Sequence, residues 1–264
     1  MSAIDKESEE YIQNLEEKIV ELSLKFKQKN NQLKSVTKEN QKILGKLTHN
    51  LKNPIGVISS FSEMMLEDLE DYSPEKLTKF LNAINNSAKF SINFLTSISK
   101  YAQVTSSEFK LSLEKVNFIE LVESVVNKLS KEADKKNINI LKKYYKNELF
   151  LNIDAFEITI ALNNILHNAI RYSDENTTVA ISINENNNKI EIICLDEGIG
   201  ISEDNLPHIF EPFFVVNTYD ETKNKCIGLG LAIAKMIIEK HAGILEVKST
   251  LNHGSEFKIL YQNE

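Results

Sequence analysis

Several residue types are scarce in this chain of 264 residues, and each scarcity excludes a class of protein. Two cysteines are too few for a disulfide scaffold and are typical of a reducing, cytoplasmic environment. No stretch approaches the ~20 consecutive apolar residues that a membrane-spanning helix needs. The acidic, polar start of the chain is not a signal peptide. The net charge of -7 comes without a basic stripe, so we expect no nucleic-acid partner.

Glycine and proline are also scarce, with eight and four residues, and their positions divide the chain. Only Gly45 and Gly56 precede residue 198, whereas six glycines fall between Gly198 and Gly254. Because glycine tolerates backbone conformations that other residues avoid, the front of the chain is expected to be long helix. The rear is expected to contain loops with unusual backbone.

The first predicted helix carries an apolar residue at alternating steps of three and four. The positions are Ile12, Leu15, Ile19, Leu22, Phe26, Lys29, Leu33, Val36, Asn40, Ile43 and Leu47, and nine of these 11 are apolar. This is the period of a coiled coil, and an Asn at a core position tends to fix the register of a two-stranded assembly. The pattern favours a parallel homodimer over a helix that packs on its own domain.

The pattern continues to Leu69 and breaks at residues 71–74, where Ser73 is a suitable N-cap and Pro74 a suitable first helical residue. A second amphipathic helix is predicted to follow, with this apolar face: Leu77, Leu81, Ile84, Ala88, Ile92, Leu95 and Ala102. The two helices predict a hairpin, and two hairpins of a dimer would close into a four-helix bundle.

A linker is expected at residues 103–108. After it, short predicted strands and helices replace the long helical pattern, and their mixed order predicts an α/β sandwich. Asn117 with Glu120 is typical of the start of a helix that runs to about Ala133. Further helices are predicted at 156–172 and 229–241. Strands are predicted at 111–114, 138–144, 150–153, 179–183, 190–195, 244–249 and 256–261. The fold class is therefore α+β.

Four motifs follow in order, and each has a bland alternative when taken alone. On a helix, Asn164, Asn168 and Arg171 share one face, which can hold hydrated Mg²⁺ and phosphate or simply face solvent. Asp196-Glu197-Gly198-Ile199-Gly200 can receive a base amino group or form only a turn. Phe210–Phe214 is an aromatic patch that also suits core packing. Gly228-Leu229-Gly230-Leu231 opens a helix whose free N–H groups favour phosphate.

These segments resemble the N, G1, F and G2 boxes of the Bergerat-type ATP-binding fold, shared by histidine kinases, Hsp90-type chaperones, type II topoisomerases and MutL proteins. Four boxes in order over about 70 residues are far more specific than one glycine motif. The resemblance covers about residues 40–262, and Gly254-Ser255-Glu256-Phe257 matches the closing strand of the family.

The resemblance implies ATP and Mg²⁺ as cofactors and a role for each matched residue. It assigns Mg²⁺ to Asn168 helped by Asn164, phosphate to Arg171, and the adenine pocket to Tyr172. It further assigns the adenine amino group to Asp196, the shape of the pocket to Gly198 and Gly200, and the phosphates to Gly228, Leu229, Gly230 and Leu231 under a flexible lid at 201–227. Lys223 or Lys225 of this lid would help to offset charge.

ATP-hydrolysing relatives usually carry Glu at the position of Asn164, and Asn is no general base, so the pattern favours a kinase. Residues 47–54 resemble the phosphoacceptor box of sensor histidine kinases, with His49 as the nucleophile. Pro54 removes one helical hydrogen bond and is expected to bend the helix. By the same resemblance, Asn53 would orient water in a reverse phosphatase reaction. The other four histidines are expected to be surface or packing residues.

The resemblance implies three segments: a coiled-coil signalling helix at 1–46, a dimerisation and phosphotransfer hairpin at 47–102, and a catalytic ATP-binding domain at 109–264. Expected partners are a second copy, a response-regulator receiver domain that takes the phosphoryl group on an aspartate, and an upstream sensor that docks on 1–46.

Two departures from the family pattern leave alternatives open. The family usually has an acidic residue where this chain has Asn50, and losing a general base often costs about 10²–10⁴-fold in rate. Many relatives also have extra glycines where this chain has Lys225-Cys226-Ile227. An active histidine kinase therefore stands beside a weakly active or phosphatase-biased regulator, and beside a Bergerat-fold ATPase or scaffold of another class.

Overall fold

The computed structural model describes residues 3–67, 72–186, 189–216 and 226–262. The side chains of residues 3–17, 36, 39, 40 and 42 lie outside this description, and with them the heptad positions Ile12, Leu15, Val36 and Asn40. The chain divides into two compact units, residues 1–88 and 89–264. Among the residues described, no helix combines the length and apolar character needed to cross a membrane.

The first unit contains a helical hairpin. Helix α1 (Ala3–Glu67) passes through Pro54 without ending, and α2 (Pro74–Thr105) begins in this unit. Ser73 caps α2 as predicted, because its carbonyl accepts from Leu77 N at 3.0 Å and its hydroxyl lies 3.4 Å from Lys76 N. Phe80 is buried, and its ring centroid lies 4.8 Å from that of Phe61 on α1. The contact confirms the predicted hairpin.

The second unit is built on a five-stranded sheet. Its order is β2 (Asn139–Tyr144), β4 (Thr178–Asn186), β5 (Lys189–Asp196), β7 (Ser255–Gln262) and β6 (Ile244–Ser249). Strands β2 and β4 are parallel and the other pairs are antiparallel. A separate antiparallel pair joins β1 (Glu114–Asn117) to β3 (Phe150–Ile153). This mixed order confirms the predicted α+β class.

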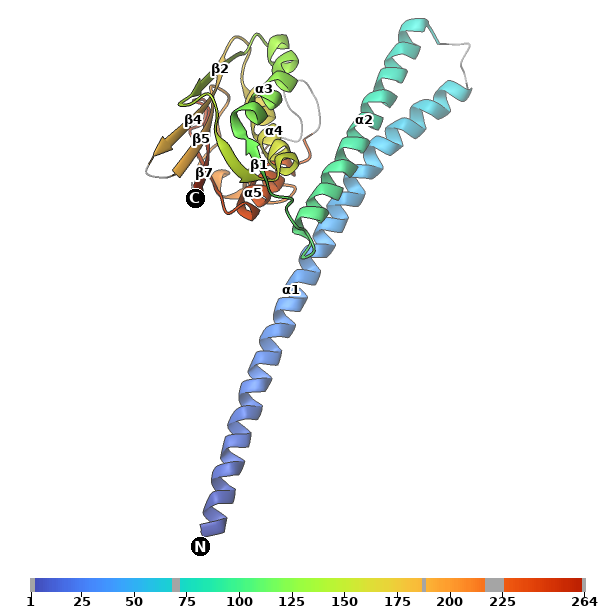
Figure 1. Ribbon diagram of the computed structural model, residues 1–264. Helices are drawn as coiled ribbons and strands as arrows, with labels where there is room; N and C mark the ends of the chain where they lie inside the picture. The colour runs from blue at the N-terminus through green and yellow to red at the C-terminus, as the bar shows by residue number, and fades with distance from the viewer. Residues whose placement is uncertain (1–2, 68–71, 187–188, 217–225, 263–264) are drawn as a thin grey trace. The chain divides into compact units, whose positions relative to one another are not determined.

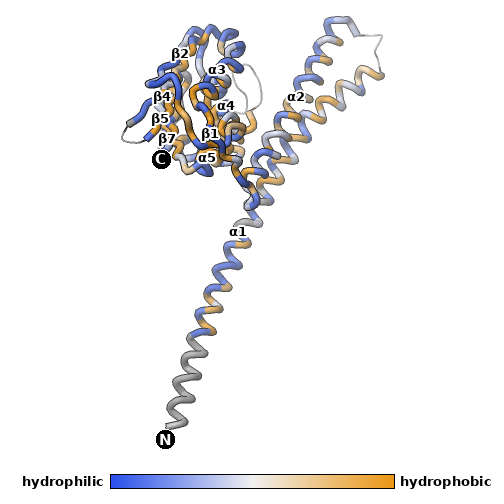
Figure 2. Tube along the Cα trace, viewed as in Figure 1, coloured by the Kyte–Doolittle hydropathy of each residue, from blue (hydrophilic) through white to orange (hydrophobic). Residues whose placement is uncertain are grey.

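Helices α3 (Phe118–Lys135), α4 (Ala155–Tyr172) and α5 (Gly230–Lys240) lie on one side of the sheet (Figure 1). A short 3₁₀ helix, η2 (Leu206–His208), lies between β5 and α5. Apolar residues gather along the strands and helices of this unit, whereas polar and apolar residues alternate along the coloured part of α1 (Figure 2). The core therefore lies between the sheet and the three helices, with Ile165, Ile192 and Ile237 almost fully buried.

Two details of the predicted elements are wrong, and a third is confirmed in part. Helix α2 continues to Thr105, because Val104 is fully buried and its burial favours another turn of helix, so the linker starts later than residue 103. The strand predicted at 111–114 begins only at Glu114, since Ser112 N donates instead to Asp154 Oδ2 at 2.9 Å. Asn117 stands at the N-cap position of α3, as predicted, but its side chain makes no cap hydrogen bond to the backbone; its amide donates instead to Glu120 Oε1 at 2.9 Å.

Candidate functional site

Helix α4 presents one polar face beside an apolar one. Its buried residues are Glu157, Ile158, Ala161, Leu162, Ile165, Leu166, Ala169 and Ile170. The helical period then leaves Asn164, Asn168 and Arg171 half-buried along the remaining face, as the sequence predicted. Two carboxamides and a guanidinium on one face offer oxygen ligands and a fixed positive charge.

Asp196 is the last residue of β5 and points into the core. Alternate residues of this strand are buried, and the alternation carries Asp196 inward after Ile192 and Cys194, so that it is 5% exposed. Its Oδ1 accepts from Gly198 N at 3.0 Å and from Ser255 N at 3.1 Å. Burial raises the pKa of this carboxyl to about 6, and the two backbone donors partly oppose the rise.

The end of α4 lies against the segment that follows Asp196. The carbonyl of Tyr172 accepts from Ile199 N at 3.1 Å, and Ser173 pairs with Gly198 in an isolated antiparallel bridge. A Cβ on Gly198 would lie 2.3 Å from Tyr172 O, which no side chain tolerates. The predicted N and G1 motifs are therefore in direct contact, and Gly198 is required for this contact.

Two glycines at the start of α5 bring the F and G2 motifs close to the polar face of α4. Gly228 has φ +74°, and its carbonyl accepts from Phe213 N at 2.8 Å. A Cβ on Gly230 would lie 3.0 Å from Asn164 Oδ1, so the polar face of α4 borders the start of α5. Leu229 precedes that helix without a side-chain cap, which leaves the first-turn N–H groups to bind an anion.

The predicted lid at 201–227 is too broad. Residues 201–216 include η2, and both Ile209 and Phe213 are buried. Only part of the range can move as a lid without breaking this packing. Lys223 and Lys225, which the sequence suggested as lid lysines, lie outside the described residues.

Cys226 is the first described residue after that gap. It lies in a loop but is buried, and its Sγ is 3.4 Å from Tyr172 Oη. The guanidinium of Arg171 lies 5.9 Å from the centroid of the Tyr172 ring. Cys194 on β5 is a buried thiol, and burial raises its pKa.

His49, Asn50 and Asn53 belong to α1 in the first unit, whereas all the nucleotide motifs belong to the second. The side chains of His49 and Asn53 are exposed, and Asn50 is half-buried. An exposed imidazole on a regular helix is accessible to a reactant from solvent. Pro54 is buried one turn further along.

The other histidines occupy surface or packing positions. His167 faces Glu132 at 3.3 Å and His208 faces Glu211 at 2.7 Å, both near solvent. His253 is exposed, and its Nδ1 lies 3.0 Å from Leu251 O. His241 packs at the end of α5, where its Nε2 accepts from the backbone N–H that precedes α4.

Sequence reasoning missed the second support of the buried carboxylate. The Gly254-Ser255 pair was recognised only as part of the closing strand, yet Ser255 N donates to Asp196, and a Cβ on Gly254 would lie 1.9 Å from Asp196 O. The contact is not evident from the sequence because Asp196 and Ser255 are 59 positions apart. Only the antiparallel register of β5 and β7, which pairs the two residues, brings them together.

These groups fit a magnesium nucleotide. The described residues contain no cluster of three or more His, Cys, Asp or Glu that could hold a metal by itself. A cation beside Asn164 and Asn168 would therefore depend on amide oxygens, water and phosphate, which is the usual coordination of Mg²⁺ at a nucleotide. The buried carboxylate, the uncapped helix start and the amide face supply one group for each part of such a ligand.

Comparisons with known proteins agree with this geometry. Residues 153–263 match the family of histidine kinase-, DNA gyrase B- and HSP90-like ATPases. The sensor protein KdpD of Clostridium acetobutylicum is 28% identical over 219 residues, which are 82% of this chain and 24% of KdpD. The sensor histidine kinase WalK of Bacillus subtilis is 25% identical over 233 residues, 86% of this chain and 37% of WalK. The chain thus spans less than half the length of these relatives.

Two solved structures share the fold. The histidine kinase ThkA, in complex with the response regulator TrrA, is 27% identical with a TM-score of 0.68, covering 86% of this chain and 64% of that one. The histidine kinase AdeS of Acinetobacter baumannii is 22% identical with a TM-score of 0.62, covering 82% and 98%. Residues 153–263 therefore form an ATP-binding domain like those of histidine kinases, DNA gyrase B and HSP90, and the chain as a whole is similar to the transmitter core of sensor histidine kinases.

Proposed function

We propose that this chain transfers the γ-phosphoryl group of Mg-ATP to its own His49 and then to an aspartate of a response-regulator receiver domain. The observation that carries the proposal is the residue at position 164. Its carboxamide lies beside Gly230 at the start of α5, where hydrolysing relatives usually have a Glu that activates water. Because an amide cannot act as that base, water is not activated to hydrolyse bound ATP, and the γ-phosphoryl group stays available to another nucleophile.

Each part of the nucleotide has a candidate group in the second unit. Ionised Asp196 accepts from the adenine amino group, with Gly198 and Gly200 allowing the backbone to approach the ring and Tyr172 lining the pocket. Asn168 and Asn164 bind Mg²⁺, which when present neutralises phosphate charge. Arg171 binds the phosphates. The backbone N–H groups at the start of α5 bind them too, in the segment Gly228, Leu229, Gly230 and Leu231.

His49 is the proposed nucleophile because it is exposed on α1 within the segment that resembles the phosphoacceptor box. A ring nitrogen forms a bond to the γ-phosphorus as the bond to the ADP oxygen breaks. Asn50 replaces the usual acidic neighbour, so proton removal from the imidazole depends on another group or on water. Asn53, exposed one turn later, is proposed to orient water for the reverse phosphatase reaction.

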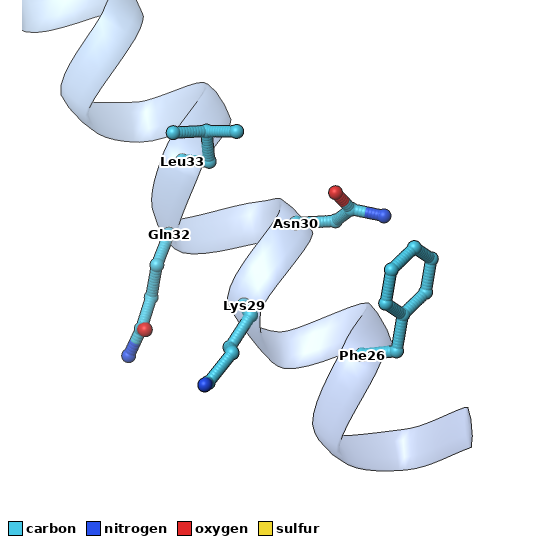
Figure 3. A pocket seen from close by; sticks show the side chains of 5 residues that line it. All are labelled: Phe26, Lys29, Asn30, Gln32 and Leu33. Carbon is cyan, nitrogen blue, oxygen red and sulfur yellow. The ribbon is translucent and has the colours of Figure 1, made fainter. Parts of the chain in front are cut away.

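We further propose that the chain forms a parallel homodimer through α1 and the hairpin. Phe26 and Leu33 are 70% and 65% exposed in the single chain and line a shallow groove with Lys29, Asn30 and Gln32 (Figure 3). A second α1 would cover this face in coiled-coil register.

Phe26→Glu should weaken dimerisation at least about tenfold in sedimentation velocity. The control Asn31→Glu, on the opposite side of the heptad, should leave it unchanged, and equal dimerisation of both variants would contradict the seam.

The receiver-domain partner is proposed from the complex that ThkA forms with TrrA. We further propose three segments in this chain: the signalling helix 1–46, on which an upstream sensor would dock, the phosphotransfer hairpin 47–102 and the ATP-binding domain 109–264. The hairpin presents Ile55, Leu81 and Leu95 as exposed apolar side chains, which dimer formation and receiver docking would have to cover between them.

Asn50 favours a second candidate, a weakly active or phosphatase-biased regulator. Incubation of the chain with γ-labelled Mg-ATP separates the candidates. Acid-labile, alkali-stable label that is lost in His49→Gln and in Asn168→Ala supports the kinase. Nucleotide binding without label would leave the regulator, and steady phosphate release that persists in His49→Gln would favour an ATPase of another class.

A further inference from the structure

Helix α4 ends without the usual left-handed cap. Most helices that end in a left-handed residue satisfy their last carbonyls with backbone N–H groups that follow. Here Ser173 has φ -82° and ψ 144°, an extended conformation that carries the following N–H groups away from the helix. The last carbonyls of α4 therefore need other donors.

Lys136 supplies these donors from another element. Its ammonium group donates to the carbonyls of Ile170 at 3.3 Å, Arg171 at 2.7 Å and Ser173 at 2.8 Å. An ammonium has three N–H donors and no acceptor, which matches three carbonyls that point to one place. A positive charge at the C-terminal end of a helix also interacts favourably with the helix dipole.

The main chain of Lys136 is itself held in place. Its N–H donates to Ala133 O at 3.0 Å at the end of α3, and its carbonyl accepts from Asn176 N at 2.9 Å. Ala133 is almost fully buried in the core. The main chain of Lys136 is therefore fixed at the end of α3, and its side chain links the end of α3 to the end of α4.

The carbonyl of Tyr172, also at the end of α4, has a donor from a different segment. Tyr172 O accepts from Ile199 N at 3.1 Å, in the segment that follows Asp196. The end of α4 is thus held by Lys136 on one side and by the segment after Asp196 on the other. The residues held between them are Arg171 and Tyr172, whose side chains are assigned to phosphate and adenine under the proposed function.

We propose that Lys136 is a positioning residue of the nucleotide site: it fixes the last turn of α4 so that Arg171 and Tyr172 meet the ligand in register with Asp196. The inference rests on the proposed function. It assigns Lys136 no contact with the nucleotide. Its effect is transmitted through the three carbonyls, so it should alter nucleotide affinity more than turnover of a saturated site.

The test compares Lys136→Met, Lys136→Arg and Lys142→Met in the full chain. Met keeps most of the apolar stem of lysine but has no donors, whereas Arg restores positively charged N–H donors. Lys142 is a control because its ammonium also forms a charged hydrogen bond, to Glu123 Oε2 at 2.7 Å, but on the surface of β2 and α3. Mg-ATP dissociation constants are measured by calorimetry at a temperature where each variant is shown by circular dichroism to be fully folded.

Lys136→Met is expected to raise the dissociation constant about tenfold, the loss expected when charged hydrogen bonds that hold a binding turn are removed. Lys136→Arg should recover most of the affinity, and Lys142→Met should match the unmodified chain. Folded Lys136→Met with unchanged affinity would overturn the inference, and so would an equal loss in Lys142→Met. If the unmodified chain bound no Mg-ATP, the proposed function would fail and this inference with it, which is a distinct result.

Discussion

The buried carboxylate of Asp196 carries a quantitative prediction about stability. Its pKa is raised from 3.8 to about 6 because folding removes the carboxylate from water. A carboxyl with a raised pKa in the folded state stabilises that state fully below about pH 4, and this contribution is lost as the pH rises through about 6. At neutral pH the ionised Asp196 therefore lowers the free energy of unfolding, as expected of a residue kept for binding.

The magnitude follows from the two pKa values. A rise from 3.8 to about 6 corresponds to about 3 kcal/mol, of which about 2 kcal/mol is lost between pH 4.5 and pH 7.5. Asp196→Asn keeps an oxygen that can accept from Gly198 N and Ser255 N but cannot ionise. The stability of the variant relative to the unmodified chain should therefore rise by about 2 kcal/mol over the same pH interval.

The assay is urea denaturation of both proteins at pH 4.5, 6 and 7.5, with nucleotide binding measured on the same samples. Above pH 6 the variant should gain stability yet bind Mg-ATP about 10–100-fold more weakly, because a charge-assisted acceptor for the adenine amino group is lost. A stability difference that stays constant across this pH range would refute the reasoning about burial. Unchanged affinity would refute the assignment of Asp196 to adenine.

Two further substitutions test the packing of the second unit by urea denaturation. Gly228→Ala should lower the free energy of unfolding by at least about 2 kcal/mol and abolish nucleotide binding, because φ is +74° and the new Cβ would lie 2.4 Å from Phe214 O. The control Gly45→Ala, which has open space around it on a helix, should be neutral or stabilising. Similar losses of stability in both variants would contradict this account. Lys100→Met should destabilise by about 3–5 kcal/mol by stranding buried Glu157, and replacing both residues by apolar ones should recover most of the loss; a cost below about 1 kcal/mol would show that the pair is hydrated.

The sequence predicted most of the elements because their signals are local. Alternating apolar residues between turn residues predicted β3 and β6 with the bounds that the structure has. The start of β1 was wrong because Leu113 is half-exposed and belongs to the segment before the strand, which pattern alone does not reveal. The end of α2 was wrong because the burial of Val104 depends on its tertiary environment.

The nucleotide motifs were identified from residues that lie close together in the sequence. The residues that hold these motifs in place lie far away in the sequence and were not identified. The inward direction of Asp196 follows from alternation along β5. The contact between Lys136 and the end of α4 spans 34 to 37 residues and depends on how α3 packs against α4. A lysine just after a helix has no distinctive pattern, so its partners emerge only when the two helices are placed together.

The central claim is that ATP bound in the second unit phosphorylates His49, and peptide mapping tests it most directly. Trypsin cleaves after Lys46 and Lys52, so residues 47–52 form one peptide in which Thr48 and His49 are the only side chains that readily accept phosphate. After incubation with Mg-ATP, mass spectrometry at neutral pH should find this peptide about 80 Da heavier, with the added mass on His49 and lost on brief acid treatment. Phosphate on Thr48 or on another peptide, or an unmodified peptide from protein shown to bind Mg-ATP, would contradict the account.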